Sequence, residues 1–179
     1  MDKFIRSIAI LAALAVLGFA PTHALADKVN ESGSMDATYA KRDVQPIPDQ
    51  DGHILMLSDA AATNKDTAGT GFLDGFSATI REIVDLTRGT GPSQGYVIFS
   101  KGPDQLVLKL SGMTTTTMKD GQPNTTFKGS FSAVDGKGAL ADTEGEGTYS
   151  GYFTAEDKFH VDWEGTRTAA KDAIADSKK

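Results

Sequence analysis

Cysteine is absent from this sequence of 179 residues, and histidine and tryptophan are scarce, with three residues and one residue respectively. Without cysteine the chain can form no disulfide and cannot carry a lipid on an N-terminal cysteine, so its stability must come from a packed core. Most zinc-binding arrangements are excluded as well. The 18 basic residues are scattered among 24 acidic ones, and nucleic acid, which needs a clustered basic face, is therefore not an expected partner.

Long apolar runs are missing too, except at the start of the chain. Lys3 and Arg6 precede an apolar run over residues 8–19, and small residues follow at 24–26. This order predicts a secretory signal peptide, residues 1–26, cleaved after Ala26. The run is shorter than the about 20 residues that cross a hydrocarbon core, so we expect a periplasmic or secreted protein with no stable membrane anchor. Cleavage removes two positive charges and one negative charge, which changes the formal net charge from −6 to −7.

The helical period of 3.6 residues is likewise missing between residues 27 and 166. Apolar and polar residues alternate instead, which is typical of strands. Two runs of this kind flank Gly102-Pro103-Asp104, and two more flank Asp120-Gly121, a pair of residues that favours a hairpin turn. In residues 76–86, the apolar face contains Phe76, Ala78, Ile80, Val84 and Leu86, with Glu82 among them.

Seven or eight such strands follow one another over residues 35–167. An antiparallel sheet of this size must bury one face and protect its edges, and closure into a barrel does both. We therefore predict an all-β domain, a closed antiparallel eight-stranded β-barrel, with a β-sandwich as the alternative. The polar residues 27–34 are interpreted as a flexible lead-in, and residues 168–179 as a polar C-terminal tail.

A glycine-rich stretch, "GKGALADTEGEG" at residues 136–147, matches the spacing of a dinucleotide-binding fingerprint. That fingerprint requires a helix that begins at the glycines and points its amides at the pyrophosphate. No helix is expected here, and Asp142, Glu144 and Glu146 would repel phosphate. We interpret the stretch as a bend between strands, where glycine permits a close approach of backbones.

Three further patterns resemble reactive or metal sites. Residues 91–95, "GPSQG", match a nucleophile elbow, but β-structure follows them rather than a helix, so a hairpin turn is the better interpretation. His160, Asp162 and Glu164 share one strand face, about 6.5–7 Å apart along the strand, which favours a solvated face. The acidic "DTEGEG" and "DQDG" lack the full spacing of a calcium loop. We expect neither a metal nor an organic cofactor.

Glu82 and Trp163 are the most informative single residues. A carboxylate on an apolar face needs a partner or has a raised pKa, and both often mark a functional site. The competing interpretations of Glu82 are a bulge that turns it outward, or a pairing with Arg81 or Lys109. Trp163 shares its face with apolar residues, so we expect it in the core or the wall of the barrel lumen.

The glycines of "DGKGALADTEGEGTYSG" also indicate a family. Gly136, Gly138, Leu140 and Gly145 resemble the glycine-rich strand of the allene oxide cyclase barrel-like superfamily, which includes the dirigent proteins. The segments "TNKDTAGTGFLDG", "GTGPSQGYVIF" and "VDWEGT" look like those of small bacterial secreted members without an assigned role. Asp142 departs from the pattern, since the plant cyclases tend to carry glycine there.

The resemblance covers residues 35–167 and implies an eight-stranded barrel with an apolar cavity, often trimeric or dimeric in the plant relatives. The plant cyclases carry a glutamate and an asparagine on their first strand. The corresponding "ATYAKRDVQPIPDQ" contains neither, so no catalytic residue is carried over.

Three functions follow from these observations. The first is an exported binding module that holds a small apolar molecule in the lumen, with Glu82, Tyr96, Phe131 and Trp163 as the predicted ligand-binding residues. The alternatives are a packed structural or envelope-stress barrel without a ligand, and a cyclase- or isomerase-like enzyme in which Glu82 is the acid or base. Assembly into a homo-oligomer stays open.

Overall fold

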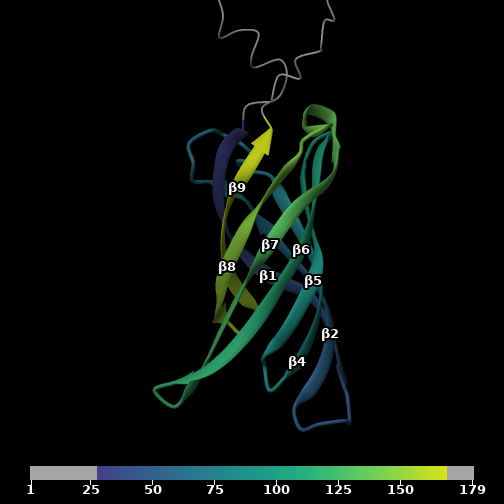
Figure 1. The fold of residues 1–179 in the computed structure, drawn as a ribbon, viewed down its shortest axis with the longest axis vertical. Helices are drawn as coiled ribbons and strands as arrows, with labels where there is room; N and C mark the ends of the chain where they lie inside the picture. The colour runs from purple at the N-terminus through teal and green to yellow at the C-terminus, as the bar shows by residue number, and fades with distance from the viewer. Residues whose placement is uncertain (1–27, 169–179) are drawn as a thin grey trace, which may run out of the picture.

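The computed structural model describes residues 28–168, so the predicted signal peptide, residues 1–26, and the predicted tail beyond residue 168 lie outside the described residues. The described chain is almost entirely β-structure (Figure 1). A short 3-10 helix, η1 (Gly138–Leu140), stands between β7 and β8, and no helix of this part of the chain is long and apolar enough to cross a membrane. The strands are β1 (Lys28–Pro46), β2 (His53–Thr63), β3 (Lys65–Asp66), β4 (Ser77–Thr87), β5 (Gly91–Lys101), β6 (Asp104–Lys119), β7 (Gln122–Lys137), β8 (Gly145–Ala155) and β9 (Lys158–Thr168).

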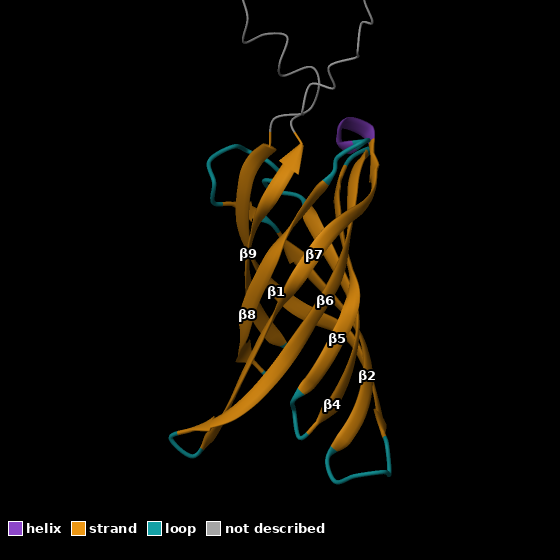
Figure 2. Ribbon diagram, viewed as in Figure 1, coloured by secondary structure: helices purple, strands orange, loops and turns teal. Residues whose placement is uncertain are grey.

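The strands form one antiparallel sheet that closes on itself (Figure 2). The order is β2-β4-β5-β6-β7-β8-β9-β1, and β1 pairs with β2 as well. β1 closes the ring because its first half pairs with β9 and its second half with β2, with a register shift between Tyr39 and Lys41. The two-residue β3 adds to the edge of β1. The predicted closed antiparallel eight-stranded barrel is confirmed, and the β-sandwich alternative is wrong.

The flexible lead-in predicted for residues 27–34 is wrong, because the chain is part of β1 from Lys28 onward. Residues 28–38 pair continuously with β9. Glu31 points inward and is only 4% exposed, and its carboxylate accepts a hydrogen bond of 2.8 Å from the Arg167 guanidinium. The inward position of this strand therefore holds an ion pair between the first and last long strands. An apolar residue there would have produced the alternation by which a strand is predicted from the sequence.

The turns between strands follow the predicted glycine positions. Gly102 and Pro103 connect β5 to β6, and Asp120 and Gly121 connect β6 to β7. Asp120 has φ 53° and Gly121 has φ 77°, the two positive values that a tight hairpin turn requires. The predicted hairpins at these two places are therefore confirmed.

The glycine-rich stretch at residues 136–147 is a bend, as predicted. It contains the end of β7, the single turn of η1 and the beginning of β8. Gly138 has φ 64°, a value that favours glycine, and the amide of Ala139 donates a hydrogen bond of 2.8 Å to the Asp104 carboxylate. In a dinucleotide-binding site, a backbone amide such as that of Ala139 would bind the phosphate. Here this amide is already bound to the Asp104 carboxylate.

Residues 91–95 lie inside a strand, so the hairpin turn expected for "GPSQG" is wrong. They form the first half of β5 and pair with β6, and residues 93–95 pair with β4 as well. A Cβ on Gly95 would stand 2.9 Å from the Cα of Glu82 in β4. Gly91 and Gly95 therefore permit a close approach of β5 to β4 within the barrel wall.

One end of the barrel is filled by the segment that connects β2 to β4. Asn64 in this segment is 1% exposed and accepts a hydrogen bond of 2.8 Å from the indole nitrogen of Trp163. The Asn64 amide nitrogen donates in turn to the carbonyl of Leu73 at 3.1 Å, and the side chain of Leu73 is buried. These two buried hydrogen bonds of Asn64 thus connect the segment to Trp163 in β9.

Candidate ligand-binding cavity

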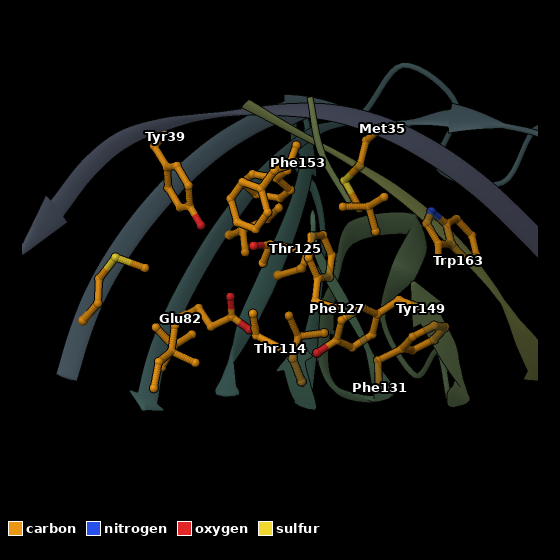
Figure 3. Close-up of a pocket in the computed structure, with 18 of the residues that line it drawn as sticks. Met35, Tyr39, Glu82, Thr114, Thr125, Phe127, Phe131, Tyr149, Phe153 and Trp163 are labelled. Atoms are coloured by element: carbon orange, nitrogen blue, oxygen red, sulfur yellow. The ribbon is translucent and has the colours of Figure 1, made fainter. Parts of the chain in front are cut away.

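A cavity of about 260 Å³ lies inside the barrel, and Figure 3 shows part of its lining. The strands β1, β2 and β4–β9 all contribute side chains to it. Most lining residues are apolar, namely Met35, Met56, Ile80, Val84, Leu86, Val97, Phe99, Leu108, Leu110, Phe127, Phe131, Phe153, Phe159, Val161 and Trp163. The others are Tyr39, Glu82, Gly89, Thr114, Thr116, Thr125 and Tyr149.

The cavity extends away from the filled end of the barrel. Trp163 and Met35 line it near the connection between β2 and β4. At the opposite end, Thr116 donates a hydrogen bond of 2.8 Å to the carbonyl of Gly89, which lies in the turn between β4 and β5. Thr116 and Thr125 also share a hydrogen bond of 2.8 Å. Hydroxyl groups and a turn therefore surround the cavity at this end.

A row of glycines makes space for one tyrosine inside the barrel. Ser93, Gly112, Gly129 and Tyr149 are register neighbours on β5, β6, β7 and β8. A Cβ on Gly129 would stand 2.6 Å from the hydroxyl oxygen of Tyr149 and 2.7 Å from the Cα of Gly112. The ring of Tyr149 therefore crosses β7 and β6 where side chains are missing, and its hydroxyl comes close to Ser93.

Glu82 points into the cavity from β4, as its position on the apolar face predicted. Neither competing interpretation holds. β4 pairs with β2 and β5 without a register shift around Glu82, and the Arg81 guanidinium lies on the outer face, 3.4 Å from the Asp59 carboxylate. Lys109 is exposed and pairs with Tyr96. Burial raises the pKa of the Glu82 carboxyl, and the nearby hydroxyl of Ser93 lowers it in part.

Two partly buried tyrosines line the cavity together with this carboxyl. Burial raises the pKa of Tyr149 to about 12, and the charge of Glu82 adds to the effect while Ser93 opposes it. Burial also raises the pKa of Tyr39 to about 12, again with a contribution from Glu82, which Arg42 opposes. The hydroxyl of Tyr149 is buried and makes no hydrogen bond of good geometry within residues 28–168. The cavity thus contains an acid and an unpartnered hydroxyl in apolar surroundings.

Three of the four predicted lumen residues line the cavity, and the prediction for Tyr96 is wrong. Glu82, Phe131 and Trp163 are lining residues, and the rings of Phe131 and Trp163 meet edge to face at 6.1 Å. Tyr96 is 45% exposed on the outer face. The inward residues of this part of β5 are Val97 and Phe99, which leaves Tyr96 on the other side.

Sequence reasoning missed Tyr39, Ser93 and Tyr149. Glycines alternate with aromatic residues in "GTYSGYFT" and "TFKGSF", and that alternation was the available signal for Tyr149. Adjacent small and large residues fill a small barrel, because its interior tapers. Ser93 and Tyr39 carried no comparable signal, since their place near Glu82 depends on which strands are neighbours.

The two described histidines lie outside the cavity, each between carboxylates. The side-chain hydrogen bond of 2.7 Å to Asp36 raises the pKa of His160, against a smaller opposing effect of burial, and Asp162 at 3.2 Å raises it further. His53 contacts Asp49 and Asp85 in the same way. No group of three metal-ligating side chains occurs within the described part of the chain.

No family model matches this sequence, and no curated protein matches it. Among solved structures, the chain is similar to one described as the structure of the pterocarpan synthase dirigent protein GePTS1. The two share 11% sequence identity with a TM-score of 0.42, and the alignment covers 88% of this chain and 100% of the other. The match carries neither an activity nor a ligand to this chain, and the barrel is established by the strand pairing.

Proposed function

We propose that this protein is an exported binding module that holds a small apolar molecule inside its barrel. The observation that carries the proposal is the unfilled cavity of about 260 Å³ with a mainly apolar and aromatic lining. Protein interiors rarely contain voids larger than a water molecule. A structural barrel without a ligand would be expected to fill this space with side chains, so the packed alternative is disfavoured.

The cavity volume limits the size of the ligand. Ligand pockets begin at roughly 300 Å³, and an apolar cavity of about 150 Å³ takes up benzene. A cavity of about 260 Å³ therefore suits a single ring with a short substituent, or a chain of equal size. We propose that the ligand enters beside Gly89 and Thr116, because the segment between β2 and β4 fills the other end.

Binding is tested with a panel of small cyclic and chain compounds. Trp163 is the single tryptophan of the sequence and lines the cavity, so its emission reports directly on occupancy. A ligand at a hundred times its Kd stabilises the folded state by about 2.7 kcal/mol, which a thermal unfolding assay detects. Emission and melting temperature that stay unchanged across the whole panel would contradict the proposal.

Two neighbouring positions on β4 provide a matched pair of variants. Val84 is buried and lines the cavity, whereas Ile83 is 50% exposed on the outer face. Val84→Phe should fill part of the cavity and abolish the ligand-induced shift. Ile83→Phe adds the same ring on the outside and should leave the shift intact.

An isomerase- or cyclase-like enzyme is the second candidate, and one observation favours it. Glu82 has a raised pKa and lies in the same cavity as the unpartnered hydroxyl of Tyr149, an arrangement suited to general acid–base catalysis. Incubation with reactive unsaturated ketones and epoxides, followed by chromatography, would detect a rearranged product of equal mass. Turnover that persists in a folded Glu82→Gln variant would exclude this role for Glu82.

Export is proposed from the N-terminal sequence and has its own test. N-terminal sequencing of the protein purified from expressing cells should give a chain that begins at Asp27. An uncleaved chain in the cytoplasmic fraction would contradict export. Light scattering on the same preparation tests the homo-oligomer that the family resemblance implies.

A further inference from the structure

We propose that the molecule held in the cavity is a small aromatic or alicyclic amine, whose ammonium group pairs with the Glu82 carboxylate while its ring packs among the aromatic side chains. This inference rests on the proposed function, since it names the ligand class for the same cavity. It depends on the charge, the hydrogen-bonding groups and the aromatic faces that line the cavity.

The charge of the cavity is the first argument. Glu82 is the single charged side chain among the described residues that line it, and no lysine, arginine or histidine does so. Burial and the Ser93 hydroxyl account for the pKa shift of Glu82, so no neighbouring cation contributes to it. Glu82 is half-buried, and a carboxylate in apolar surroundings without a cationic partner is unfavourable, so a ligand that brings the positive charge removes that penalty.

Arg81, the neighbour of Glu82 in the sequence, and Arg42, which lies beside Tyr39, are both engaged elsewhere. Arg81 lies on the outer face beside Asp59. The Arg42 guanidinium stands 5.2 Å from the ring centroid of Tyr39 and donates a hydrogen bond of 3.1 Å to the carbonyl of Glu156. The positive charge that Glu82 lacks would therefore have to come from a ligand.

The hydroxyl groups near Glu82 suit the remaining hydrogens of an ammonium group. A primary ammonium carries three N–H donors and no acceptor. Thr114 lines the cavity, and Figure 3 shows it beside the Glu82 carboxyl, whereas the Tyr149 hydroxyl is covered by the wall of the barrel. Thr114 is the next inward residue of β6 after Gly112, the register neighbour of Ser93. The Glu82 carboxylate and the Thr114 hydroxyl oxygen can thus accept hydrogens from the ammonium group.

The aromatic lining suits both parts of an amine. Cations are attracted to the faces of aromatic rings within about 6 Å of the centroid, and the attraction grows when water is excluded. Tyr39, Phe127, Tyr149 and Phe153 all line the cavity together with Glu82. A carboxylate-bearing ligand would be repelled by Glu82, and a neutral alcohol would leave its charge uncompensated. An aromatic or alicyclic amine both neutralises the charge of Glu82 and packs its ring against the apolar lining.

The test compares three probes of similar size. These are 2-phenylethylamine, the neutral 2-phenylethanol and the anionic 3-phenylpropanoate, titrated at neutral pH by calorimetry and by Trp163 emission. We expect the amine to bind at least about tenfold more tightly than the alcohol, and the propanoate to show no binding. The affinity for the alcohol reports on apolar binding in the cavity without an ion pair. It therefore tests the proposed function separately from this inference.

Two glutamate variants make the test specific. Glu82→Gln should remove the preference for the amine, a loss of about tenfold or more, while the alcohol binds as before. Glu164→Gln is the matched control, because Glu164 is an exposed residue of β9, and it should leave all three affinities unchanged. Near-ultraviolet circular dichroism verifies that each variant is folded.

Each outcome is decisive. If the alcohol binds as tightly as the amine, or if Glu82→Gln keeps the amine preference, the amine inference is overturned and the binding module stands. If all three probes and the wider apolar panel fail to bind, the proposed function fails and the inference fails with it. If Glu82→Gln does not fold, the amine-to-alcohol ratio of the unaltered protein decides.

Discussion

Gly33→Ala is the substitution whose effect the structure defines most sharply. Gly33 in β1 pairs with Trp163 in β9, and a Cβ at position 33 would stand 2.6 Å from three atoms of the indole ring. Carbon atoms in contact are normally about 3.5–4.0 Å apart, so the ring must move by about 1 Å. Such a movement stretches the hydrogen bond of 2.8 Å from the indole nitrogen to Asn64.

The expected cost combines two effects. Overpacking of a core costs about 1–3 kcal/mol, and a buried hydrogen bond that is broken costs about 1–3 kcal/mol. We therefore expect Gly33→Ala to lower the free energy of unfolding by about 2–6 kcal/mol. For a domain of this size each kcal/mol lowers the melting temperature by about 2–4 °C.

Urea unfolding of a double-mutant cycle measures this effect. Gly33→Ala, Trp163→Phe and the double variant are compared, because the smaller phenylalanine ring leaves room for the new methyl group. Gly33→Ala should cost at least about 1 kcal/mol less in the Trp163→Phe background. A cost below about 0.5 kcal/mol in the unaltered background, with unchanged Trp163 emission, would refute the seating of the indole on Gly33.

Three more predictions concern the buried polar groups. Because burial raises the pKa of Glu82, the folded state binds more protons than the unfolded state between the two pKa values, so stability should fall as the pH rises through this window. Urea unfolding from pH 4 to pH 8 should show that fall, and Glu82→Gln should remove that component; an identical profile in the variant would contradict it. Arg167→Met leaves the buried Glu31 without its cation and should cost about 3–5 kcal/mol in urea unfolding, whereas a loss below about 1 kcal/mol would show that the pair is not buried. Tyr149→Phe removes a buried hydroxyl without a partner, so the variant should be up to about 1 kcal/mol more stable in the same assay, and a clear loss of stability would reveal a partner.

The alternation of apolar and polar residues predicted much of the fold. Each strand has two faces, and Glu82 was placed on the buried one because its neighbours Ile80 and Val84 are apolar while Arg81 and Ile83 alternate with them. Alternation failed where both faces carry apolar residues. In "YVIF" it could not distinguish Tyr96 and Ile98 from Val97 and Phe99, and contact with the lumen decided which pair points inward.

Long-range partners explain the other errors. Residues 28–34 looked unstructured because their inward position is occupied by Glu31, and its partner Arg167 is 136 positions away along the chain. The residues that surround Glu31 in the sequence contain no information on its pairing with Arg167. The segment becomes a strand because β9 offers both backbone hydrogen bonds and a guanidinium.

The sequence by itself determined most of the strands, the hairpin turns at residues 102–103 and 120–121 and the inward direction of Glu82, because these depend on neighbours within a few residues along one strand. Tertiary structure alone decided which strands close the ring, how Tyr149 crosses Gly129 and Gly112 toward Ser93, and that a cavity of about 260 Å³ stays unfilled. The physical reason is that a cavity depends on how side chains from eight strands fit together in space, and alternation along one strand does not specify that fit.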